Sequence, residues 1–152
     1  MSLTQAEFET ILADATKRIE GNIVWDEDED HSPAVEFRAE IFSDAGYPLF
    51  IRGSVNRLAK TLTFAVIHRG AGRIYGLDMG KDHRNPDGQL VGEKHKHRWT
   101  DLHQAKEAYV PADITAPEDK PVTVWTQFCV EASITHDGAL ENPPMIQAGV
   151  GL

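Results

Sequence analysis

The fold is decided by residues 34–78, which read AVEFRAEIFSDAGYPLFIRGSVNRLAKTLTFAVIHRGAGRIYGLD. Four short runs in this stretch alternate apolar and polar residues, which is the period of a half-buried strand; they lie at about 34–41, 49–55, 61–68 and 73–78. Short turns with glycine and proline separate the runs. Because parallel neighbours need a crossover of a dozen residues or more, strands this close pair antiparallel. The stretch therefore predicts an antiparallel meander.

Residues with helical spacing flank the meander on both sides. Thr4 and Glu7 form a capping-box pattern ahead of apolar residues at helical spacing, which predicts a helix over about 5–20. Residues 121–134 indicate a second helix, although their β-branched content leaves a strand open. Residues 101–109 suggest a short helical turn. The predicted fold class is α+β, an N-terminal helix packed on a four- to five-stranded antiparallel meander sheet, with a C-terminal helix.

The bulk properties indicate one globular domain, residues 1–152, with residues 136–152 as a loosely held tail. Hydrophobic residues make up 41% of the chain and charged residues 26%, which is typical of a folded protein. No apolar run approaches the roughly 20 residues that span a bilayer, so no membrane partner is expected. The N-terminus shows no signal peptide, and a single cysteine, Cys129, excludes an intramolecular disulfide. These features predict a cytoplasmic protein.

A second stretch carries the candidate chemistry: residues 80–99, which read GKDHRNPDGQLVGEKHKHRW. Residues 85–88, NPDG, are a strong turn sequence that would present His83 on a rigid loop. The alternation over 94–100 predicts a further strand with His95, His97 and Trp99 on one face. Lys96 and Arg98 would then lie on the other face.

The charge of this stretch differs from that of the rest of the chain. Between residues 81 and 98, five basic residues against three acidic ones give +2, which leaves −11 elsewhere in a chain of net charge −9. The overall charge argues against general nucleic-acid affinity, since that affinity depends on neutralising phosphates. A local positive patch on an acidic body still attracts one phosphate or a short strand.

Three interpretations of the histidines follow from these residue types. In a metal site, His95 and His97 with His83 or Asp78 would supply the ligands. In an anion site, the histidines and Arg84 would grip a phosphate and cleave an RNA backbone without metal. In the third interpretation the loop is a structural turn, and the charges belong to a solvated edge strand that resists aggregation.

The segment YGLDMGKDHRNPDGQLVGEKHKHRWTD resembles an uncharacterised bacterial domain family that has no established activity. The pattern is an aspartate-bearing strand, then H-x-N-P-D-G, then H-x-H in the next strand; it is carried by Asp78, His83, Asn85, Pro86, Asp87, Gly88, His95 and His97. The likeness covers the second half of the chain and implies a genuine site of unassigned function. A weaker analogy links the helix-then-meander order to small bacterial ribonuclease toxins.

The leading hypothesis from the sequence is a site that binds phosphate or RNA, acting as a metal-independent phosphodiesterase. His95 or His97 would be the base, His83 the acid, and Arg84 would stabilise the developing charge. The expected binding residues around them are Lys81, Asn85, Arg98 and Trp99, although Trp99 beside the histidines is more often a core residue than a base-stacking one. The alternatives are a non-catalytic module whose acidic surface binds a basic protein, and a metal enzyme that uses the H-x-H pair. The sequence leaves open whether the chain is an enzyme, and it names no cofactor and no oligomeric state.

Overall fold

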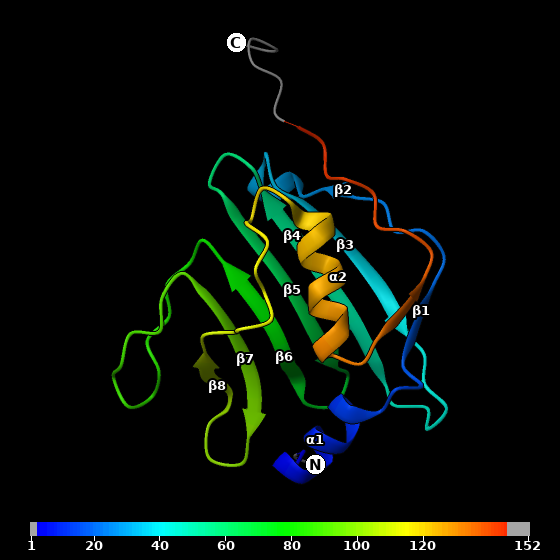
Figure 1. Cartoon of the computed structure of the whole chain (residues 1–152), viewed down its shortest axis with the longest axis vertical. Helices are drawn as coiled ribbons and strands as arrows, with labels where there is room; N and C mark the ends of the chain where they lie inside the picture. The colour runs from blue at the N-terminus through cyan, green and yellow to red at the C-terminus, as the bar shows by residue number, and fades with distance from the viewer. Residues whose placement is uncertain (1–2, 146–152) are drawn as a thin grey trace.

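The computed structural model describes residues 3–145 as an α+β fold built on one large sheet (Figure 1). Seven strands pair in sequence order as an antiparallel meander. Their bounds are β2 Asp26–Glu27, β3 Val35–Ile41, β4 Leu49–Asn56, β5 Thr61–His68, β6 Gly72–Met79, β7 Lys94–Thr100 and β8 Gln104–Tyr109. The predicted class and meander are confirmed, and the sheet has more strands than expected.

Two helices and a small parallel sheet complete the described chain. The helices are α1, Gln5–Ala13, and α2, Pro121–Glu131, which confirms the helical interpretation of residues 121–134; a short 3-10 helix spans Glu29–His31. β1, Arg18–Glu20, pairs in parallel with β9, Thr135–Asp137. No helix within residues 3–145 has the length and apolar character needed to cross a bilayer.

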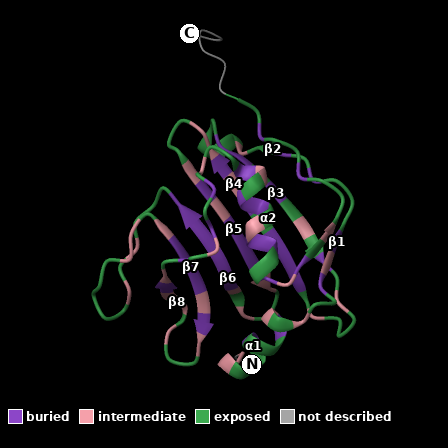
Figure 2. Ribbon diagram, in the orientation of Figure 1, coloured by how far each residue is buried: buried purple, intermediate pink, exposed green. Residues whose placement is uncertain are grey.

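α2 lies across one face of the sheet and forms the core with it (Figures 1 and 2). Phe37 of β3 and Phe64 of β5 contact Trp125 of α2, with ring centroids 5.6 and 5.1 Å apart. Gly53 of β4 provides the room for this packing, because a Cβ there would lie 2.0 Å from the ring of Phe37. The alternating strand residues therefore divide into a face toward α2 and an opposite face, here called the outer face.

Two helical predictions were wrong, because strand pairing overrides the local pattern over Arg18–Glu20 and Gln104–Tyr109. α1 ends at Ala13 rather than near 20, and the buried Lys17 ammonium donates to three carbonyls at its C-terminal end, those of Ile11, Leu12 and Asp14. Residues 104–109 form strand β8 rather than a helical turn, because they pair with β7.

The predicted loose tail is also corrected over its described part. Residues 135–137 form β9, and the Trp25 indole donates to the carbonyl of Glu141 at 2.7 Å. The guanidinium of Arg57 holds the carbonyls of Pro143 and Pro144. Residues 146–152 of the predicted tail lie outside the described residues.

Candidate metal centre

The segment between β6 and β7 forms a small hairpin, residues 80–93, that carries His83. The NPDG turn closes its tip, where the Gly88 amide donates to the Asn85 carbonyl at 2.8 Å. At its base, Asp82 Oδ1 accepts from the amides of His83 and Gly92 at 2.9 and 3.0 Å. The loop is thus ordered by its own turn chemistry, as the sequence predicted.

Asn85 fixes this hairpin to the sheet. Its side-chain amide accepts from the amide of Ala108 and donates to the carbonyl of the same residue, both at 2.9 Å. The Asn85 side chain therefore pairs with edge strand β8 as a neighbouring strand would. His83 Nε2 also meets the Lys106 carbonyl at 2.9 Å, so the hairpin holds His83 over the outer face.

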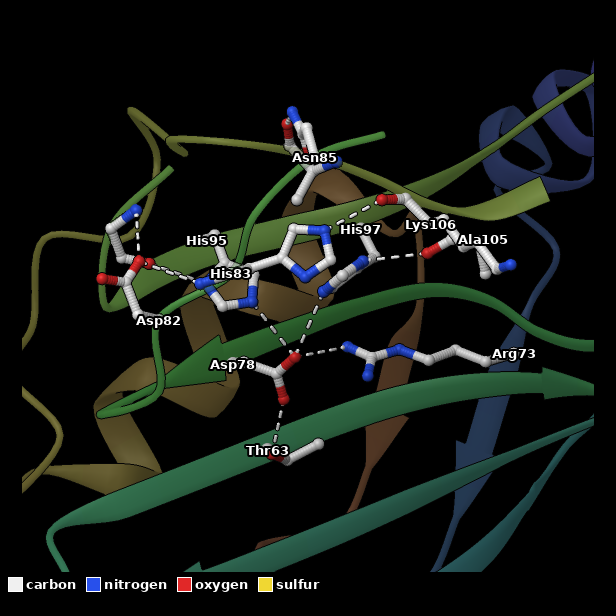
Figure 3. A network of polar contacts seen from close by, with 12 residues as sticks. Thr63, Arg73, Asp78, Asp82, His83, Asn85, His95, His97, Ala105 and Lys106 are labelled. Atoms are coloured by element: carbon white, nitrogen blue, oxygen red, sulfur yellow. Dashed lines mark hydrogen bonds and ion pairs between the residues drawn. The ribbon is translucent and has the colours of Figure 1, made fainter. Parts of the chain in front are cut away.

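His83, His95 and His97 converge on one point above Asp78 (Figure 3). One ring nitrogen from each histidine lies within 4.8 Å of the others, and the ring centroids are 4.5–5.3 Å apart. Asp78 Oδ2 lies 3.4 Å from Nε2 of both His95 and His97. The three histidines that the sequence offered as ligands therefore form one cluster, and Asp78 contacts two of its members.

The second ring nitrogen of each histidine is held by a backbone carbonyl. His95 Nδ1 meets the Gly92 carbonyl and His97 Nδ1 the Ala105 carbonyl, both at 2.9 Å, as His83 Nε2 meets Lys106. Because a carbonyl only accepts, each bond places a proton on that nitrogen. In the neutral rings the converging nitrogens, His83 Nδ1 and Nε2 of the other two, then carry lone pairs.

Asp78 is kept ionised beneath the histidines. Its Oδ1 accepts from the Thr63 hydroxyl at 2.7 Å, and its Oδ2 lies 3.2 Å from Arg73 Nη2. Burial raises the pKa of Asp78, but His95, His97, Arg73 and Thr63 together hold this pKa well below the usual range. The site thus presents a carboxylate and three imidazoles, the hard and borderline donors that divalent transition metals take.

Lys96 lies on the opposite face of β7 and does not join the histidines. Its side chain is fully buried, with Nζ 2.6 Å from Asp113 Oδ2, 2.7 Å from Glu131 Oε1 and 2.8 Å from the Tyr75 hydroxyl. This corrects the interpretation of β7 as a solvated edge strand. β7 is an inner strand, flanked by β6 and β8, that presents histidines on one face and a buried lysine on the other.

The remaining predicted site residues lie apart from the histidines. Arg84 is exposed and donates to the Gly88 carbonyl within the hairpin, whereas Lys81 is exposed near the outer face. Arg98 lies 5.8 Å from the ring of Tyr109. Trp99 was expected beside the histidines, but a bulge between Arg98 and Thr100 interrupts the alternation. Trp99 packs in the core, and its indole donates to the Leu3 carbonyl at 2.8 Å.

Sequence reasoning missed Thr63 and Arg73, the two partners of Asp78. Thr63 is the direct cross-strand partner of Asp78 in the β5–β6 hairpin. A β-bulge at Val66 and Ile67 shifts the register of this hairpin by one residue, so counting back from the turn gives the wrong partners.

Comparison with known proteins gives a family but no activity. No curated protein and no solved structure matches the chain. Residues 3–134 match a family described as a family of unknown function, DUF6978. This match begins near the N-terminus and so extends well beyond the second half that the H-x-N-P-D-G and H-x-H pattern covers. The chain belongs to this family of unknown function.

Proposed function

We propose that this chain binds a divalent transition-metal ion, zinc by its donor set, through His83, His95, His97 and Asp78. The observation that carries the proposal is the convergence of one ring nitrogen from each of the three histidines, two of which also contact the Asp78 carboxylate. When the carbonyl-bound nitrogen of each neutral ring carries the proton, the other nitrogen turns a lone pair toward the same space as the carboxylate, and a cation there would bind these donors. A single proton would form one hydrogen bond between a ring nitrogen and the carboxylate, whereas one metal ion would bind all these donor atoms at once.

The separations support a metal rather than a set of hydrogen bonds. Asp78 Oδ2 lies 3.4 Å from each of two imidazole nitrogens, beyond the usual N–H···O range. Ligands at the usual distances from a tetrahedral zinc ion, about 2.0–2.1 Å, lie roughly 3.3–3.4 Å from one another. The two distances from Asp78 therefore match the edge of a zinc tetrahedron, and the three histidine nitrogens lie within 4.8 Å of one another.

The carbonyl partners of the histidines support the same conclusion. Metal-bound histidines generally donate their second ring N–H to a carbonyl or carboxylate, which fixes the tautomer and the orientation of the ring. All three histidines have such a carbonyl, at 2.9 Å in each case. Because His83 comes from the hairpin and the other ligands from β6 and β7, a bound ion would tie the hairpin to the sheet.

A metal-free use of the same histidines is the second candidate. Burial of His95 and His97 next to an ionised Asp78 favours it, because such an arrangement suits general acid–base transfer. In this variant of the phosphodiesterase hypothesis, Arg73 rather than Arg84 would stabilise developing charge, since Arg73 is the arginine that contacts Asp78.

Metal content of the untagged protein tests the proposal. We expect one zinc ion per chain in the wild type and in His31→Ala, an exposed histidine at the 3-10 helix, and none in His97→Ala. After chelation, zinc at 100 times its dissociation constant should restore about 2.7 kcal/mol of stability. The wild type and the control should both gain this stability, and His97→Ala should not. Absence of metal and of this stabilisation with zinc, cobalt, manganese or iron would overturn the metal site and leave the metal-free candidate.

A further inference from the structure

A groove of about 610 Å³ runs over the outer face of the sheet and borders the candidate metal centre. Its lining includes Thr63 and Arg73, the two residues that bond to Asp78. Ala65 and Ile67 of β5 give it an apolar floor. The volume lies within the range of small-molecule sites.

The groove carries more positive than negative charge, although the chain is acidic overall. Its cations are Arg38, Arg52, Arg73 and Lys81, and its anions are Asp26 and Glu36. This gives a net charge of +2 in a chain whose net charge is −9. Local positive charge of this kind concentrates anions from solution.

Two of the arginines oppose each other directly. Arg38 of β3 and Arg52 of β4 are cross-strand partners, an arrangement in which like charges repel and destabilise the pair. Both side chains are exposed on the outer face, and neither forms an ion pair or a side-chain hydrogen bond with another residue of the described range 3–145. Arg38 stacks on the ring of Phe50 at 3.8 Å, which orients its guanidinium. The two guanidinium groups thus have no carboxylate partner among the described residues, and an anionic ligand would provide the opposite charge.

The register connects this arginine pair to the histidines. One row of partners crosses the outer face through Arg38, Arg52, Ala65, Gly76 and His97. The side chain at Ala65 is small, and the space over Gly76 holds the guanidinium of Arg73. Strands lie about 4.8 Å apart, so the backbones of β4 and β7 are separated by roughly 14 Å.

Gly76 also lets Arg73 reach along β6 to Asp78. A Cβ at Gly76 would lie 2.5 Å from Arg73 Nη2 and 2.7 Å from Nε, so only glycine leaves the guanidinium flat against the backbone. Arg73 Nε is buried and has no partner among the described residues. Arg73 thus adds a third guanidinium between the arginine pair and the cluster.

We infer that the groove is the binding site of a small organic phosphate, with its phosphate group on Arg38 and Arg52. A phosphate monoester carries about −1.5 to −2 charges at neutral pH, which matches two facing guanidinium groups better than a single carboxylate does. Asp26 and Glu36 are cross-strand partners at the β2 end of the groove and would repel a second phosphate. A ligand with one phosphate therefore fits, and a nucleic-acid strand does not.

The body of such a ligand would extend over Ala65 and Arg73 toward Asp78 and the histidines. The phosphate group would then contribute to ligand recognition at the arginines, and a different part of the ligand would lie at the histidines. Contact between the other end of the ligand and a metal ion rests on the proposed function. Binding of the phosphate group at the arginines does not depend on it.

Binding of inorganic phosphate and adenosine 5′-monophosphate to the full chain, measured by calorimetry in phosphate-free buffer, tests the inference. We expect saturable binding of the nucleotide at one site and no binding of adenosine. Arg52→Gln should weaken binding about tenfold or more, since it removes a charge-assisted contact. Lys120→Gln makes the same charge change at the start of α2 and should bind as the wild type does. Arg38→Gln repeats the test if Arg52→Gln fails to fold.

The two proposals fail separately in this design. Binding of the nucleotide to chelated His97→Ala, with loss in Arg52→Gln, supports the groove whatever the metal content proves to be. Absence of binding by both phosphate and nucleotide, or equal binding by adenosine, would overturn the groove inference and leave the metal site intact. Tighter binding of a short single-stranded RNA than of the nucleotide would also overturn it.

Discussion

Replacement of Lys96 by methionine should destabilise the protein strongly, because Lys96 anchors β7 from the face opposite the histidines. Its ammonium is fully buried and contacts two carboxylates and a phenol at 2.6–2.8 Å. The Tyr75 and Tyr109 hydroxyls also donate to Glu131, which closes a network between α2 and strands β6, β7 and β8. Methionine keeps the volume of the side chain and removes only its charge and donors.

The magnitude follows from the exposure of the partners. Removing one member of a fully buried ion pair costs about 3–5 kcal/mol, because the other charge stays buried. Here the Asp113 and Glu131 side chains are 31% and 39% exposed, so water solvates their carboxylates once Lys96 is replaced. We therefore expect a loss of about 2–3 kcal/mol in the free energy of unfolding, or roughly 4–12 °C in Tm for a chain of this size.

Urea unfolding followed by circular dichroism measures this loss. Lys94→Met is the matched control, since Lys94 lies on the same face of β7 but, among residues 3–145, its ammonium donates to the Ile114 carbonyl alone. Adding Glu131→Gln to Lys96→Met should recover part of the loss, because it removes one unpaired carboxylate. A Lys96→Met protein within about 0.5 kcal/mol of the wild type, the usual range for surface substitutions, would refute the anchoring role.

The pH dependence of stability gives an independent check. Burial raises the pKa of Glu131, but Lys96, Tyr75 and Tyr109 outweigh burial and lower it below the ordinary 4.5. A carboxyl with a lowered folded-state pKa stabilises the protein above its unfolded pKa, and this contribution is lost as the pH falls through the folded value. The wild type should therefore lose this contribution below about pH 4.5, whereas Lys96→Met should show a shallower acid limb.

Two further predictions concern the hairpin and the groove. Asn85→Ala should free the hairpin from β8 and speed amide exchange at Ala108. It should also weaken zinc binding by mispositioning His83, and unchanged exchange would contradict the strand-like pairing. Arg52→Gln should raise the free energy of unfolding by a few tenths of a kcal/mol in phosphate-free buffer, since it relieves repulsion from Arg38. A loss of stability under thermal unfolding would show that the two arginines do not repel.

The sequence pattern predicted the structure correctly where neighbouring residues alone determine it. The alternation over 34–78 yielded four strands near their observed bounds, and the NPDG turn formed as its residues require. Local pattern failed where a distant segment decides the outcome. Residue 19 has helical spacing but belongs to β1, because β9 pairs with it from 117 residues further along the chain. Trp99 was misplaced by a bulge that only the pairing with β8 creates.

The sequence by itself determined the fold class, the meander order and the shared face of His95 and His97, because side-chain periodicity depends only on backbone geometry. Tertiary structure alone decided the site. It placed His83 through the contacts of its hairpin with β8, added Thr63 and Arg73 through the register across a bulge, and turned Lys96 inward to Glu131. These contacts join residues on separate strands and helices, and their pairing depends on packing that no local pattern encodes.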